Sequence, residues 1–203
     1  NIGKSVFIDL SADFRLEDPK IYKKNYNIEH QSPSLLKEFV YGLPEINSIN
    51  IRNSKNIAVP GCYPTSILLP LIPLLKEDLI LTNNIIIDSK SGYSGAGKKF
   101  NLTNIRQKKD LNFYNYNTNN HRHICEIYQE LNKFSNSNVK FSFNPHVLPI
   151  FRGLMSTIYC DLKKGSKKDE IINALKKEYS DKVFIDILNH NIKADFFSVC
   201  HTN

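Results

Sequence analysis

Apolar residues follow two patterns along this chain. Some segments have the pattern of a strand, and others have the spacing of an amphipathic helix. Apolar residues predict a short buried strand at residues 6–10 and further strands at 57–59, 85–87, 154–162, 183–188 and 196–199. Alternating apolar and polar residues predict another strand at 139–143. Amphipathic helices are expected at residues 123–131 and 169–179, where apolar side chains recur at helical spacing. No internal repeat is visible. Helices and strands are therefore mixed, and the class is α/β or α+β.

A third helix is expected at residues 66–79, which are almost uniformly apolar. This pattern is typical of a buried helix. Pro70 and Pro73 both fall inside it. An interior proline removes a hydrogen bond and costs about 3 kcal/mol unless the helix kinks. We therefore expect this helix to bend or to begin late.

The segment Gly61-Cys62-Tyr63-Pro64-Thr65 lies between the strand at 57–59 and this helix. A strand, a turn and a proline in the first helical turn place Cys62 at a helix N-terminus. Free N–H groups and the helix dipole favour a thiolate there, and a thiolate is a nucleophile. The alternative is that Cys62 is a small buried apolar residue, the usual fate of a free cysteine.

Composition and charge indicate a folded protein with a solvated, basic surface. The 203 residues are 41% hydrophobic, enough for a packed core, and the net charge of +7 comes from scattered lysine pairs rather than one basic stripe. A solvated surface explains the lysines better than a nucleic-acid interface. No window has the length of a membrane span, and the first residues lack the order of a signal peptide. The chain begins at Asn1 without methionine, so we expect an internal fragment.

The four cysteines are widely spaced and form no CxxC pair. This spacing favours reduced thiols in a cytoplasmic protein over a disulfide framework.

A glycine-rich loop at residues 91–98 follows the strand at 85–87. Residues 92–98 fit the G-x-x-x-x-G-K core of a phosphate-binding loop, but Lys99 stands where serine or threonine would hold magnesium. The magnesium-nucleotide interpretation is therefore weak. A loop whose N–H groups meet a cofactor or substrate and a plain flexible loop both remain open.

The densest polar cluster is His121-Arg122-His123-Ile124-Cys125-Glu126. On a helix, His123 and Glu126 are neighbours, and a carboxylate beside an imidazole suits general acid–base chemistry. The spacing matches no usual zinc pattern, so we expect no metal. A solvated helix start remains the alternative. Further along, Arg152 lies in a turn rich in proline and glycine, where it could bind an anion or pin the turn through an ion pair.

Six segments, in the same order, resemble N-acetyl-gamma-glutamyl-phosphate reductase of arginine biosynthesis. They cover nearly the whole chain: Asp9-Leu10-Ser11-Ala12-Asp13-Phe14-Arg15-Leu16, Tyr41-Gly42-Leu43-Pro44-Glu45, Pro60-Gly61-Cys62-Tyr63-Pro64-Thr65, Ser91-Gly92-Tyr93-Ser94-Gly95-Ala96-Gly97, His121-Arg122-His123 through Glu126-Ile127, and Pro145-His146 through Arg152-Gly153. Two departures are Cys125, where the family usually has proline, and Pro70 in the helix behind Cys62.

The resemblance implies NADPH-dependent reduction of an acyl phosphate to an aldehyde. Cys62 would form the thioester and His123 would be the acid–base residue. The residues implied to line the substrate site are Arg15, Tyr116, His121 and Glu126, with Arg152 as a further candidate. The loop residues implied to meet NADPH are Ser91, Gly92, Ser94, Gly95, Ala96 and Gly97.

The resemblance also implies a domain organisation. Residues 1–59 would be the end of a Rossmann-like NADP-binding domain. Residues 60–203 would be most of an α+β catalytic and dimerisation domain with a mixed, largely antiparallel sheet. The family's nucleotide-binding glycines are absent here, so we expect weak or no NADPH binding by residues 1–203 alone. The family implies a homotetramer with a small-molecule substrate, without nucleic acid or membrane partners.

Three alternatives to this function stay open. An aspartate-semialdehyde dehydrogenase-like enzyme would share the cysteine chemistry. A hydrolytic or acyl-transferring enzyme would use Cys62 and His123 without nicotinamide, and a non-catalytic nucleotide-binding module would use residues 92–98.

Overall fold

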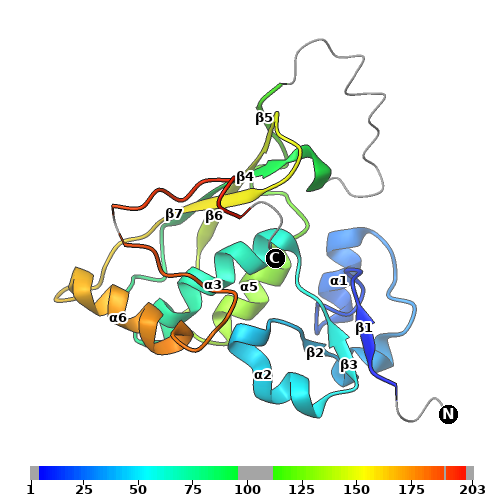
Figure 1. The fold of residues 1–203 in the computed structure, drawn as a ribbon. Helices are drawn as coiled ribbons and strands as arrows, with labels where there is room; N and C mark the ends of the chain where they lie inside the picture. The colour runs from blue at the N-terminus through cyan, green and yellow to red at the C-terminus, as the bar shows by residue number, and fades with distance from the viewer. Residues whose placement is uncertain (1–4, 96–111, 190, 200–203) are drawn as a thin grey trace.

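The computed structural model describes residues 5–95, 112–189 and 191–199. A three-stranded parallel sheet lies near the N-terminus, with strand order β1-β3-β2 (Figure 1). Its strands are β1 (Phe7–Asp9), β2 (Val40–Tyr41) and β3 (Asn56–Ala58). The helices between them are α1 (Pro19–Tyr26), the 3-10 helix η2 (Pro33–Glu38) and α2 (Pro44–Asn53). Parallel strands joined through helices are the arrangement expected of an α/β unit.

The second sheet has four strands in the order β5-β6-β4-β7. They are β4 (Ile85–Gly92), β5 (Tyr114–Asn115), β6 (Phe141–Leu148) and β7 (Leu154–Tyr159). β4 pairs in parallel with β6 and antiparallel with β7, and β5 is antiparallel to β6. The mixed sheet predicted for this part of the chain is therefore present.

Helices α3 (Cys62–Lys76) and α5 (Ile124–Asn132) lie together beside this sheet (Figure 1). α6 (Lys168–Tyr179) packs on α3. The apolar side chains of α3 that the sequence indicated are buried, and Ile67 and Leu68 are fully inaccessible. They meet Ile85 and Ile87 of β4 and Ile127 of α5 in one core. This core fixes the start of α3, and with it Cys62.

α3 continues through both of its prolines. Pro73 cannot donate to the carbonyl of Leu69, four residues earlier. The hydroxyl of Tyr179, on α6, donates to that carbonyl at 2.6 Å instead. The expected late start did not occur, because α3 begins at Cys62.

Three strand predictions need correction. Residues 183–188 and 196–199 form turns and irregular chain, and Val183 and Phe197 are each 90% exposed. Apolar runs become strands only where a neighbouring strand pairs with them, and the sequence pattern does not contain that information. The run at 6–10 does form β1, but at a sheet edge, where Phe7 and Ile8 are exposed rather than buried.

Candidate active site

Cys62 is the first residue of α3. β3 ends at Ala58, and Gly61 caps the helix with an extended backbone, φ −68° and ψ 156°. The carbonyl of Gly61 accepts hydrogen bonds from the N–H and the hydroxyl of Thr65, both at 3.0 Å. Cys62 itself is exposed. The predicted helix N-terminus is therefore confirmed, and the fully buried alternative is wrong.

The surroundings of Cys62 do not favour the thiolate that the sequence suggested. Although the residue as a whole is exposed, the protein around the sulfur displaces part of its water, and this raises the pKa of the Cys62 thiol above its ordinary value. The N–H groups of Tyr63 and Cys62 and the guanidinium of Arg15 lower the pKa of this thiol, but by less. The helix terminus therefore stabilises the thiolate only in part, and a base is needed to remove the proton.

Glu126 holds the turn that precedes Cys62. Its Oε1 accepts the N–H of Gly61 at 2.8 Å and the hydroxyl of Tyr41 at 2.7 Å. The residue is 2% exposed, and this burial raises the pKa of its carboxyl. Arg15, Gly61 and Tyr41 each lower the pKa of the same carboxyl. Glu126 thus binds the cysteine turn, rather than orienting His123 as the i, i+3 spacing suggested.

The His123 ring packs directly on Gly61. A Cβ atom added at Gly61 would lie 2.6 Å from Nε2 of His123, so only glycine leaves room for the ring. Burial lowers the pKa of His123 to about 3, which makes the imidazole neutral near pH 7. Its buried Nδ1 has no hydrogen-bond partner among the described residues. A neutral imidazole that packs on Gly61, the residue before Cys62, can accept a proton.

His121 and Tyr116 form the second layer of this site. Nδ1 of His121 accepts the N–H of His123 at 3.1 Å, and burial lowers the pKa of His121 to about 4. The His121 ring lies 5.5 Å from the Tyr63 ring and 5.5 Å from the Tyr116 ring. The Tyr116 hydroxyl donates to the Tyr63 hydroxyl at 3.3 Å. The structure therefore brings both histidines and Tyr116 together around Tyr63, the neighbour of Cys62.

The side chain of Arg15, which lies between β1 and α1, reaches the turn that precedes Cys62. Its Nε donates to the carbonyl of Val59 at 2.7 Å, and its Nη2 donates to the carbonyl of Leu10 at 3.2 Å. Nη1 lies 3.5 Å from Oε2 of Glu126. That buried Oε2 has no hydrogen-bond partner among the described residues. Buried polar atoms without a hydrogen bond, such as Oε2 and the Nδ1 of His123, are uncommon in folded proteins, and a catalytic role is one explanation for them.

The described part of the glycine-rich loop differs from a phosphate cradle. The N–H groups of Gly92, Tyr93 and Ser94 donate to the carbonyls of Gly153, Ile150 and Phe151 at 2.8–3.0 Å. These three N–H groups are engaged within the protein. Any contact of this part of the loop with a cofactor would come from its accessible side chains and carbonyls. Ala96 and Gly97 lie outside the described residues.

Ser91 and Arg152 have different surroundings. The hydroxyl of Ser91 accepts a hydrogen bond from the Tyr63 hydroxyl at 3.0 Å, which connects β4 to the residue next to Cys62. Arg152 is exposed in the turn between β6 and β7, with its guanidinium carbon 5.2 Å from the centre of the Phe151 ring. The structure brings Ser91 into the cysteine site and places Arg152 in the turn that binds the loop.

Two tyrosines and a glutamine were missed as site residues. Tyr41 belongs to a family-like segment, Tyr63 follows Cys62, and Gln129 lies one turn beyond Glu126. The i, i+3 spacing of Glu126 and Gln129 was the available signal, since it places both on one face of α5.

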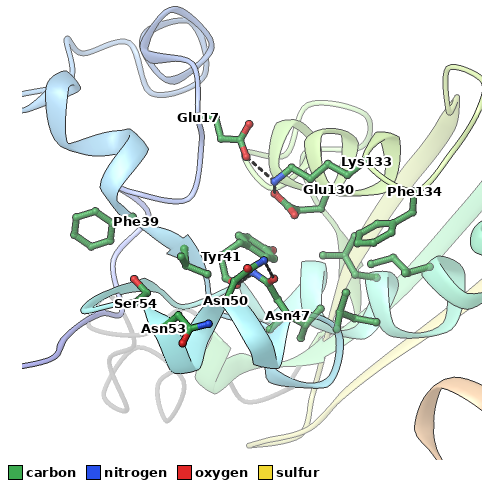
Figure 2. Close-up of a pocket in the computed structure, with 15 residues that line it drawn as sticks. Glu17, Phe39, Tyr41, Asn47, Asn50, Asn53, Ser54, Glu130, Lys133 and Phe134 are labelled. Carbon is green, nitrogen blue, oxygen red and sulfur yellow. Dashed lines mark hydrogen bonds and ion pairs between the residues drawn. The ribbon is translucent and has the colours of Figure 1, made fainter.

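A separate pocket of about 720 Å³ lies between β2, α2 and the C-terminal end of α5 (Figure 2). Its lining includes Tyr41, Asn47, Glu130 and Lys133, but not Cys62 or the histidines. In Figure 2, Lys133 bridges Glu17 and Glu130 at the rim.

Residues 5–95, 112–189 and 191–199 contain no group of three His, Cys, Asp or Glu side chains that could hold a metal ion. No helix in the same ranges is both long and apolar enough to cross a membrane.

The fold and the cysteine site fit one protein family, that of the semialdehyde dehydrogenases. Residues 62–203 match the family model described as semialdehyde dehydrogenase, dimerisation domain. This match covers more than half of the chain, and the chain belongs to this family. The match begins at Cys62, and the predicted division of the chain near residue 60 stays a prediction.

The names of the curated relatives are more specific than that of the family model, and they agree with the resemblance seen in the sequence. N-acetyl-gamma-glutamyl-phosphate reductase of Caldicellulosiruptor bescii is 46% identical over 192 residues, which are 95% of this chain and 55% of that protein. The enzyme of the same name from Ruthia magnifica is 43% identical over 97% of this chain and 57% of that protein. A relative from Arabidopsis thaliana, 41% identical, is named as probable and chloroplastic. The chain spans about half the length of the curated relatives it matches.

Solved structures support the fold alone. Aspartate semialdehyde dehydrogenase II from Vibrio cholerae matches with a TM-score of 0.57 at 16% identity, over 85% of this chain and 53% of that one. The enzyme from Francisella tularensis matches with a TM-score of 0.56 at 18% identity, over 85% of this chain and 56% of that one.

Proposed function

We propose that the protein carrying this chain reduces N-acetyl-glutamyl phosphate to N-acetyl-glutamate semialdehyde in arginine biosynthesis, with NADPH as reductant. The observation that carries the proposal is the arrangement of Cys62 and His123: an exposed thiol at a helix N-terminus, one residue from the glycine on which a neutral, buried imidazole packs. Relatives at 40–46% identity bear the name of this reductase, which supports the substrate class.

The chemistry assigned to Cys62 and His123 is acyl transfer. The thiol proton moves to the imidazole of His123, and the sulfur attacks the carbonyl carbon of the acyl phosphate. A C–S bond forms, the C–O bond to phosphate breaks, and inorganic phosphate leaves with the electron pair. The raised pKa of the thiol and the lowered pKa of the imidazole both keep this pair neutral until substrate arrives.

Reduction of the thioester needs a hydride, which NADPH supplies when bound. Ser91, Gly92, Ser94 and Gly95 are assigned to the contact with the cofactor, and Ser94 and Gly95 are more accessible than Ser91 and Gly92. Ala96 and Gly97 remain candidates on the basis of the sequence. When the aldehyde is released, the C–S bond breaks and its electrons return to the sulfur of Cys62.

Substrate contacts are assigned to Arg15, His121, Tyr116 and Glu126. Arg15 and Glu126 act on Cys62 with opposite sign: Arg15 lowers and Glu126 raises the pKa of the thiol. The guanidinium is the natural partner of an anionic substrate. Arg152 is assigned a weaker role, because its guanidinium stacks on Phe151 in an exposed turn.

The assembly and location of the protein are proposed from the family. The dimerisation-domain match supports a homo-oligomer, and we propose the homotetramer in the full-length protein. The proposed location is the cytoplasm.

Turnover of the full-length protein tests the proposal. We expect phosphate-dependent reduction of NADP with N-acetyl-glutamate semialdehyde, and its loss in Cys62→Ser. Turnover of aspartate semialdehyde instead would favour the aspartate enzyme. Acyl-phosphate hydrolysis without NADP reduction would favour the hydrolytic alternative. Tight binding of ATP with magnesium would favour the nucleotide-binding module.

A further inference from the structure

Gln129 holds the main chain on both sides of Leu16. Its Oε1 accepts the N–H of Glu17 at 2.8 Å, and its Nε2 donates to the carbonyl of Arg15 at 3.0 Å. The same Nε2 donates to Oε1 of Glu130 at 2.8 Å. A carboxamide is suited to this position because it supplies a donor and an acceptor together.

The segment held by Gln129 carries the Arg15 side chain to the cysteine turn. Arg15 is bonded there to the carbonyl of Val59, two residues before Gly61, and faces Glu126. Glu126 and Gln129 are one turn apart on α5, so one helix face holds both the guanidinium and the main chain of Arg15. A displacement of the main chain at Arg15 would therefore move the guanidinium relative to Cys62.

A second connection joins the same segment to α5. Nζ of Lys133 lies 2.6 Å from Oε1 of Glu17 and 2.7 Å from Oε1 of Glu130. Figure 2 draws both ion pairs as dashed lines. The Glu17 side chain is 67% exposed, and ion pairs with such exposure contribute little. The contact also reaches only the side chain of Glu17. Glu17→Gln, which removes this exposed ion pair and keeps the main-chain N–H that Gln129 binds, therefore offers a matched control.

We propose that Gln129 is a positioning residue for Arg15, which fixes the main chain at Arg15 and Glu17 so that the guanidinium stands beside Cys62 and Glu126. The inference rests on the proposed function, which assigns Arg15 to the binding of an anionic acyl phosphate. Glutamate at position 129 would not serve, because a carboxylate has no donor for the Arg15 carbonyl and would repel Glu130.

Steady-state kinetics of the full-length protein with the acyl phosphate and NADPH test this proposal. Gln129→Met is expected to raise the KM for acyl phosphate about three- to tenfold, the effect of one or two lost hydrogen bonds. Glu17→Gln is expected to leave KM unchanged. Gln129→Glu, which keeps the size of the side chain, is expected to raise KM as well, and it serves if Gln129→Met does not fold.

A double-mutant cycle separates positioning from general stability. In an Arg15→Ala background, Gln129→Met is expected to add no further rise in KM, because its effect passes through Arg15. Additive penalties, or an unchanged KM in both Gln129 variants, would overturn the positioning role while leaving the proposed function intact. If Arg15→Ala alone leaves KM unchanged, the substrate role of Arg15 is wrong, and the proposal fails with it.

Discussion

The backbone N–H of Gly61 donates to Oε1 of Glu126 at 2.8 Å, although the two residues are 65 positions apart in the sequence. This bond joins α5 to the turn that carries Cys62. The acceptor is buried, and the hydroxyl of Tyr41 shares it. The nucleophile candidate is therefore placed by a carboxylate from another helix as well as by its own helix.

Gly61→Ala is expected to displace the His123 ring. An alanine Cβ would lie 2.6 Å from Nε2 of His123, while the backbone at φ −68° accepts alanine without strain. Overpacking of this kind costs about 1–3 kcal/mol. Chemical denaturation should show this loss in the free energy of unfolding, together with loss of turnover in the full-length protein.

The control for Gly61→Ala is the same substitution in a His123→Ala background. Removal of the ring should abolish most of the penalty, since the clash is with the imidazole alone. A penalty that persists at full size would contradict the packing of His123 on Gly61.

Cys62 is expected to be alkylated faster by iodoacetamide than Cys125 or Cys160. It is exposed whereas the other two are half-buried. Because the pKa of Cys62 is raised, the rate should keep climbing as the pH rises above neutrality. Arg15→Met should slow the reaction at fixed pH, because the guanidinium lowers this pKa. Peptide mass spectrometry resolves the sites, and faster labelling of Cys125 would refute this description of the thiol.

Stability should fall as the pH is lowered from about 6.5 toward 4. Burial lowers the pKa of His121 to about 4 and that of His123 to about 3, below the unfolded value near 6.5. The contribution of the two neutral imidazoles to the free energy of unfolding is complete above the histidine pKa of the unfolded chain. It is lost as the pH falls below that value, because the unfolded chain then binds protons that the folded chain does not. Each imidazole adds a slope of up to about 1.4 kcal/mol per pH unit in this window.

Urea denaturation at several pH values measures this slope. His121→Asn should flatten it relative to the unsubstituted protein, since one of the two groups is removed. An identical slope in both proteins would show that His121 is not held neutral by the fold.

Residues 1–203 alone are expected to bind NADPH weakly or not at all. The N–H groups of Gly92, Tyr93 and Ser94 are engaged by carbonyls of the neighbouring turn and cannot cradle a phosphate. Calorimetry with the isolated chain measures this directly. Micromolar affinity would mean that the loop supplies a cofactor site by other atoms.

Much of the fold could be predicted where the pattern was long and strongly periodic. α3, α5 and α6 and the strands around the core followed from apolar periodicity, because burial of those faces determines them. The runs at 183–188 and 196–199 show the limit. Strand formation depends on a partner, and a local apolar run does not reveal whether one is present.

The sequence predicted which residues belong to the site better than it predicted which of them contact one another. Cys62, His121, His123, Glu126 and Arg15 do come together. The sequence suggested a Glu126–His123 pair from helical spacing, whereas Glu126 instead binds Gly61 and Tyr41. Contacts between segments far apart in the chain, such as Gln129 with Arg15, depend on tertiary packing that periodicity does not encode.

Trapping of the acyl-enzyme tests the central claim, that Cys62 is the acyl-accepting nucleophile, most directly. The full-length protein would be mixed with N-acetyl-glutamyl phosphate in the absence of NADPH, and its peptides examined by mass spectrometry. We expect stoichiometric phosphate release and an N-acetyl-glutamyl thioester on the peptide that contains Cys62, both absent in Cys62→Ser. An adduct on another residue, or phosphate release that survives in Cys62→Ser, would contradict it.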